Sequence, residues 1–128
     1  MAPVADINNN PDNLVINVRS FGETVEKVES LIVPWIKGCH EARFAVTLKH
    51  FPGHCDTNID SNSDLPTINH PLERLYNVEL RPFIEGIRAG SDTIMTAHIY
   101  FPALEERHLW PATLSKSVLT GLLKKIRV

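Results

Sequence analysis

The chain lacks the features that mark a disulfide-stabilised, exported or membrane-spanning protein. Its 128 residues include two cysteines, Cys39 and Cys55, which are too few for a disulfide framework. Two thiols fit a reducing compartment without excluding secretion. No basic region followed by an apolar run begins the sequence, so no signal peptide is visible and we expect a cytoplasmic location. The longest apolar stretch, Ser30 to Ile36, is interrupted by Pro34 and is too short to span a bilayer.

An excess of charge of one sign is also lacking. The 13 lysines and arginines are interspersed with 15 aspartates and glutamates, which gives a formal net charge of −2. A basic face of the kind that binds nucleic acid is therefore not expected, and neither is a membrane partner. Hydrophobic residues make up 43% and charged residues 22%, a balance typical of a globular chain, and the length is that of one domain.

Three strand-like runs alternate with three helical patterns. The runs cover Ala2–Ile7, Phe44–Phe51 and Thr93–Tyr100. The expected helices run from about Glu23 to Ala42, from Pro71 to Gly90 with a break or bend at Pro82, and from a cap at Ser115 to about Ile126. This βαβαβα order, without a repeat or linker, predicts a parallel sheet with right-handed crossovers, either doubly wound or part of a barrel.

Polar side chains stand at the carboxyl ends of all three runs, where parallel α/β proteins gather their chemistry. Asp6 ends the first run, Lys49 and His50 end the second, and His98 lies near the end of the third. Lysine and histidine can donate hydrogen bonds to the hydroxyls of a polyol or neutralise an anion. The alternative is an ordinary ion pair between Lys49 and Asp6.

Several motifs together resemble the β-N-acetylhexosaminidase branch of glycoside hydrolase family 3. They are Ala-Pro-Val-Ala-Asp-Ile-Asn from Ala2, Val-Ile-Asn-Val-Arg-Ser-Phe-Gly from Val15, Lys-His-Phe-Pro-Gly-His from Lys49, Asp-Leu-Pro from Asp64, Met-Thr-Ala-His from Met95 and Pro-Ala-Thr-Leu-Ser from Pro111. The similarity extends from Ala2 to Lys125 in the order of the family. Cys55 and Arg43 stand where that family has glycine, and Leu14 where it has proline.

The resemblance implies a TIM-type (β/α)8 barrel, of which residues 1–128 would be a single, incomplete part of about three βα units. It implies retaining hydrolysis of β-linked N-acetylglucosamine, with no metal or organic cofactor. Arg19, Lys49 and His50 would hydrogen-bond the sugar, and His98 would line the same pocket. Because three βα units cannot close a barrel, open sheet edges also predict self-association.

Retaining hydrolysis needs a nucleophile and an acid/base. In this branch the nucleophile is an aspartate on a later strand, so we expect these 128 residues to lack it. The acid/base is a histidine two residues after an aspartate. Here Asp60 matches the dyad's aspartate, but Asn62 occupies the histidine's position and cannot shuttle a proton. We therefore expect the chain to be inactive alone.

Two other functions remain open. The first is a non-catalytic sugar-binding or interaction module that keeps Arg19, Lys49 and His50. The second is a metal hydrolase that uses His50, His54, Asp56 and Cys55 as ligands. The sequence Pro52-Gly53 disfavours the second, because it prevents the helix that would bring two histidines at this spacing onto one face.

Overall fold

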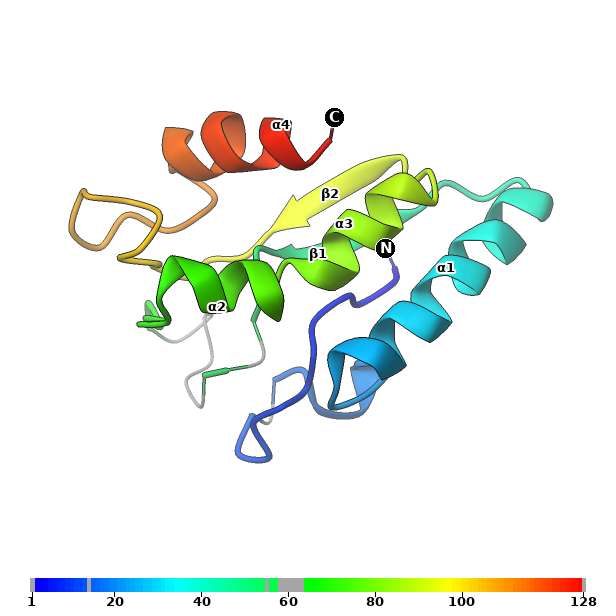
Figure 1. The fold of residues 1–128 in the computed structure, drawn as a ribbon, viewed down its shortest axis with the longest axis horizontal. Helices are drawn as coiled ribbons and strands as arrows, with labels where there is room; N and C mark the ends of the chain where they lie inside the picture. The colour runs from blue at the N-terminus through cyan, green and yellow to red at the C-terminus, as the bar shows by residue number, and fades with distance from the viewer. Residues whose placement is uncertain (1, 14, 55, 58–63, 128) are drawn as a thin grey trace.

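A computed structural model describes residues 2–13, 15–54, 56–57 and 64–127 (Figure 1). Its helices and strands, in chain order, are η1 (Asn17–Arg19), α1 (Val25–Glu41), β1 (Thr47–Phe51), α2 (Leu72–Asn77), α3 (Arg81–Arg88), β2 (Thr93–Thr96), η2 (Ser117–Leu122) and α4 (Leu123–Ile126). Strands and helices alternate as the sequence predicts. No helix within the described ranges is long and apolar enough to cross a membrane.

The sheet is parallel, with β1 beside β2. Thr47 pairs with Thr93 and Lys49 with Met95, after which the register shifts so that Phe51 pairs with Thr96. On the other side of β1 lies the N-terminal segment, where Ala5 N donates to Lys49 O at 2.7 Å. The spatial order is thus N-terminal segment, β1, β2, which is the sequential order of neighbouring strands in a barrel.

The expected first strand, Ala2–Ile7, is not formed over that whole length. Its one strand-type pairing is an isolated parallel bridge between Val4 and Lys49. Pro3 has no N–H to give to a ladder, and Asn9 N already turns back to Ile7 O at 2.9 Å. The prediction of an extended, parallel segment was right, and the prediction of a regular strand was wrong.

The other two strands are also shorter than predicted. The run from Phe44 becomes a strand only at Thr47, and Phe44 itself is 68% exposed. Arg43, immediately before it, has a φ of +61°, the left-handed conformation for which the family uses glycine. At the other end β2 stops at Thr96, and Tyr100 instead forms separate bridges to Thr67 and Pro111.

The helices agree more closely with the sequence pattern. The side chain of Thr24 caps α1 by accepting from Lys27 N at 3.3 Å, and the apolar face of α1 buries Val28, Ile32 and Ile36. The expected break in the second helix is present between α2 and α3. Pro82 lies in the first turn of α3, where its missing N–H costs nothing.

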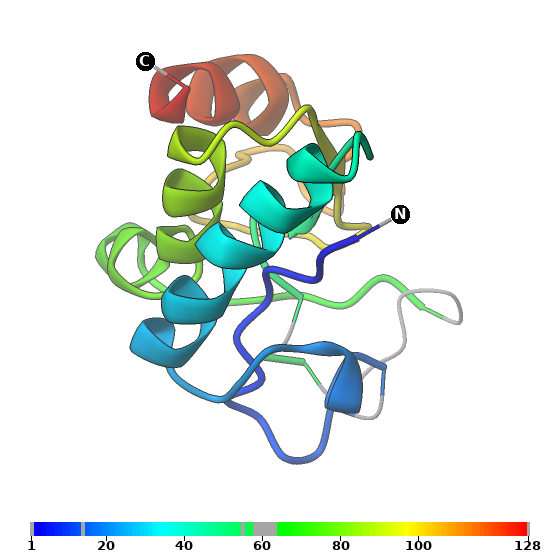
Figure 2. The same ribbon diagram turned by 90° about the vertical axis from the view of Figure 1, so that its right-hand side faces the viewer.

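The core lies between β1 and the helices. Leu48 and Phe51 of β1 are fully buried, and the ring of Phe51 meets Phe83 of α3 edge-on at 5.4 Å. A Cβ added to Gly86 would stand 2.6 Å from Leu48 Cδ1, so only glycine lets α3 approach the strand this closely. Figure 2 shows α1 to α4 toward one side of the molecule, and the N-terminal segment with the connecting loops toward the other.

Candidate functional site

Asp6 is the centre of the site at the carboxyl end of the sheet. The residue is 1% exposed, and its carboxylate accepts from His50 N at 3.0 Å, from His54 N at 2.9 Å and from His50 Nδ1 at 2.8 Å. The ion pair that the sequence suggested between Asp6 and Lys49 is therefore replaced by one between Asp6 and His50. The register shift in β1 leaves His50 without a partner opposite it on β2, which frees its backbone N–H for this contact.

His54 forms a second imidazole wall beside His50. The two rings are 5.6 Å apart in an edge arrangement, and His54 is 3% exposed. Burial lowers the pKa of His54 below 6.5, although the charge of Asp6 opposes that shift. Asn13 holds the segment in place, because its amide donates to His54 O at 3.0 Å.

Arg19 comes from η1, on the loop that follows the N-terminal segment. Its guanidinium bends back to its own turn, with Nε donating to Val15 O at 3.1 Å. Ser20 anchors the same loop, because its hydroxyl donates to Asp6 O at 2.6 Å. The arginine side chain is exposed, so most of its donors face solvent or a ligand.

His98 follows β2 and completes the rim. Its Nδ1 lies 3.3 Å from the hydroxyl of Thr113, which in turn donates to Ala97 O at 3.0 Å. Since the single hydroxyl proton is used on Ala97 O, the contact with Thr113 favours a proton on Nδ1 of His98 and leaves Nε2 to face the pocket.

One pocket of about 290 Å³ is lined by Arg19, His50, His54 and His98, together with Val15, Ile16 and residues 95–97. Ligand pockets usually measure roughly 300–1,000 Å³, so this one suits a single small ring. Of the sugar-binding residues expected from the sequence, Arg19, His50 and His98 meet here, and Lys49 is not among the lining residues. Their role as sugar ligands stays a prediction.

The predicted dyad, Asp60 and Asn62, lies outside the described residues and also stays a prediction, as do the departures at Cys55 and Leu14. The ligand set of the metal-hydrolase alternative is not brought together among the described residues. His50 and His54 gather on Asp6, whereas Asp56 pairs with His70. The sequence suggested His54 as a metal ligand and did not predict that it lines the sugar pocket.

Comparisons with known proteins show the family of the chain. The model for the glycosyl hydrolase family 3 N-terminal domain matches residues 1–126, and the chain belongs to this family. Beta-hexosaminidase A of Pseudoalteromonas piscicida is 42% identical over 96% of this chain and 22% of its own length.

Two solved structures extend the comparison. A family 3 β-N-acetylglucosaminidase from Paenibacillus sp. str. FPU-7 is 52% identical, with a TM-score of 0.95 over 98% of this chain and 24% of that one. NagZ from Neisseria gonorrhoeae, solved with N-trifluoroacetyl-D-glucosamine, is 32% identical, with a TM-score of 0.88 over 98% of this chain and 36% of that one. The chain therefore has the fold of part of a TIM-type barrel, and it spans 22–36% of the length of these three proteins.

Proposed function

We propose that this chain supplies the sugar-binding side of a retaining glycoside hydrolase that acts on β-linked N-acetylglucosamine. The observation that carries the proposal is the pocket in which Arg19, His50 and His98 meet above a buried carboxylate. The relatives support the substrate class, since the Paenibacillus protein is a β-N-acetylglucosaminidase and the Neisseria protein was solved with an N-acylated glucosamine.

The pocket chemistry fits a neutral polyol. Nδ1 of His50 is engaged by Asp6, so Nε2 remains to exchange a hydrogen bond with a hydroxyl, and the orientation of the ring is already fixed. Arg19 adds donors in a planar fork. Convergence of such groups on one ring fixes it for attack, which is the positioning part of catalysis. Lys49, next to His50 on β1, is proposed as a further donor that reaches the ring from the strand.

The catalytic groups themselves are a separate question. A retaining mechanism needs two of them, and the family pattern places the acid/base where this sequence has Asn62. We therefore propose that the 128-residue chain binds sugar without turning it over. The second candidate function, a sugar-binding remnant without catalysis, predicts the same binding but no activity in any context.

A graft into a complete enzyme tests the proposal. Residues 1–126 would replace the matching segment of the Paenibacillus enzyme, whose structure they follow closely. We expect the chimera to bind N-acetylglucosamine, and His50→Ala to weaken this binding by about tenfold through the lost hydrogen bond to a sugar hydroxyl. His40→Ala, which removes an exposed imidazole paired with Asp92, is the matched control. A folded chimera in which His50→Ala and His40→Ala bind sugar equally would disprove the proposed pocket.

A further inference from the structure

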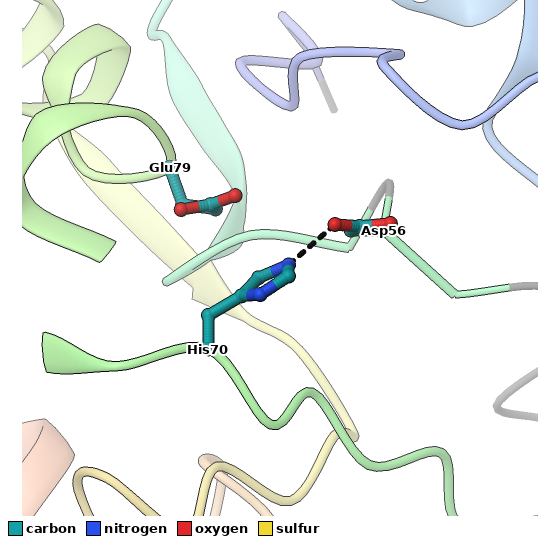
Figure 3. Close-up of side chains that lie close together, drawn as sticks. All are labelled: Asp56, His70 and Glu79. Carbon is teal, nitrogen blue, oxygen red and sulfur yellow. Dashed lines mark hydrogen bonds and ion pairs between the residues drawn. The ribbon is translucent and has the colours of Figure 1, made fainter. Parts of the chain in front are cut away.

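A second group of ionisable side chains lies outside the sugar pocket. Asp56 follows the turn after β1, His70 precedes α2, and Glu79 occupies the corner between α2 and α3. One potential ligand atom from each lies within 4.8 Å of the others, and Asp56 Oδ2 is hydrogen-bonded to His70 Nε2 (Figure 3). Figure 3 shows the three side chains arriving from separate segments and facing a common space.

The positive charge that now faces these carboxylates is the guanidinium of Arg74, and its hydrogen bonds to them are poor. Nη2 of Arg74, in α2, lies 3.2 Å from Asp56 Oδ2 and 3.3 Å from Glu79 Oε1. Charge-assisted hydrogen bonds usually measure about 2.7–2.9 Å, so both contacts are long. The Nε of Arg74 is buried and has no hydrogen-bond partner among the described residues.

Glu79 gives an independent indication of a missing partner. The residue is 7% exposed, and its buried Oε2 accepts no hydrogen bond from any described group. An unused oxygen on a buried carboxylate is costly, because desolvation is not offset.

We propose that Asp56, His70 and Glu79 form a binding site for one divalent transition-metal ion of the Zn²⁺ type. An imidazole nitrogen with two carboxylate oxygens suits such an ion better than Mg²⁺ or Ca²⁺, which prefer oxygen ligands alone. Bonds of about 2.0–2.2 Å place tetrahedral ligand atoms about 3.4 Å apart. The ligand atoms of the three groups lie within 4.8 Å of one another, so the widest separation needs to close by about an ångström, whereas Asp56 and His70 are already in contact. The ion would take the place of Arg74, whose side chain is 37% exposed and can turn outward.

The ion would have a structural role. Asp56 lies two residues beyond His54, whose backbone N–H is held by Asp6. A metal at Asp56 would therefore link the segment of His54, which lines the sugar pocket, to Glu79 at the corner between α2 and α3. This role goes beyond the proposed hydrolysis, which uses no metal, and it amends the expectation from the sequence that no metal is bound.

Calorimetric titration of the chelator-treated 128-residue chain with Zn²⁺ tests the site. We expect one ion per chain and a rise in Tm with Zn²⁺ but not with Mg²⁺. His70→Ala and Glu79→Gln should each weaken Zn²⁺ binding by at least about 10–100-fold, since even residues that only support a ligand have effects of this size. Arg74→Gln should strengthen binding, because it removes the competing cation and keeps all three ligands. His40→Ala is the control for the loss of an imidazole.

Each outcome decides the proposal. An unchanged Tm and no heat of binding would overturn it, as would Zn²⁺ binding that is lost with His50→Ala but kept with His70→Ala. Weaker binding in Arg74→Gln would identify the group as an ordinary ion-pair network. Far-UV circular dichroism verifies that each variant is folded, and Glu79→Gln, which conserves shape, decides the test if His70→Ala does not fold. Hydrolytic activity is not a readout, so failure here leaves the proposed function standing.

Discussion

The molecule contains two aspartate–histidine pairs of the same composition in different surroundings. In the first, the Asp6 side chain is fully buried and takes two of its hydrogen bonds from backbone N–H groups. In the second, the Asp56 side chain is 28% exposed, and its partners among the described residues are the side chains of His70 and Arg74. Backbone donors cannot move away without unfolding the chain, whereas side-chain donors can. The first pair is therefore suited to positioning, and the second to exchanging one cation for another.

The largest expected effect tests whether either pair serves as the acid/base that the family pattern would place at Asn62. In the Paenibacillus chimera, Asn62→His should raise kcat by about 10²–10⁴-fold, because general acid/base catalysis contributes that much. Asp60→Ala should then remove most of the gain, since the aspartate orients the imidazole.

The contrast between the Asp6–His50 and Asp56–His70 pairs would have to be revised if His70 already served as the acid/base. Asn62→His would then give no gain, and His70→Ala would abolish the activity of the chimera. Aryl substrates with good leaving groups provide the control, because they need little protonation at the glycosylation step and should respond less to Asn62→His.

The next largest effect is the difference in the free energy of unfolding between variants of the two aspartates. Asp6→Ala should lower the free energy of unfolding by about 3–5 kcal/mol, because it leaves buried donors of His50 and His54 without an acceptor. Asp56→Ala, measured without metal, should cost about 1 kcal/mol or less, as is usual for exposed ion pairs. Urea unfolding measures both. Equal losses would mean that the two pairs do not differ in the way the contacts indicate.

Arg43→Gly is a reference substitution, because Arg43 belongs to neither aspartate–histidine pair. Because Arg43 adopts a φ of +61°, replacing it by glycine should raise the free energy of unfolding by about 1 kcal/mol. Sugar binding and Zn²⁺ binding should both stay as they were. Lys37→Gly, inside α1, is the control, and it should lower stability by a similar amount.

The smallest effect is a pH dependence from His54. Burial holds its folded pKa below 6.5, with Asp6 opposing the shift and His50 and Arg19 adding to it. Above about pH 6.5 the imidazole is neutral in both states, so its contribution is fully present. As the pH falls through 6.5 the unfolded chain takes up a proton first, and stability is lost. Urea unfolding from pH 8 to pH 5 should show a shallower loss in His54→Gln, with exposed His108→Gln as the control.

Local patterns were enough to predict the helices and the order of the fold. The buried face of α1 follows from its periodicity, and the hydroxyl of Ser115 accepts from Val118 N at 3.1 Å, as its predicted cap role requires. The strands were predicted too long, because the apolar runs were followed through Pro3, which has no N–H donor, and because such a run does not reveal that Arg43 turns the chain.

The sites were harder to predict for a different reason. Asp6 and His50 meet through a register shift, which alternation along a strand cannot foretell. Asp56, His70 and Glu79 come from segments with no common periodicity, and only the tertiary fold brings them together. Motif similarity located the pocket residues, and packing decided which of them line it.

The dependence of the pocket on Asp6 has a consequence for the order of events during folding. Its partners His50 and His54 lie 44 and 48 residues further along the chain. Closing a loop of that length costs about 3 kcal/mol of chain entropy, which must be met before any of these hydrogen bonds can form. α1 can form from local contacts alone, so the helix should appear in the early kinetic phases of refolding and the pocket only when the N-terminal segment docks. During synthesis on the ribosome, this docking must wait until the β1 segment has emerged, so a fragment that ends at residue 45 cannot form the pocket.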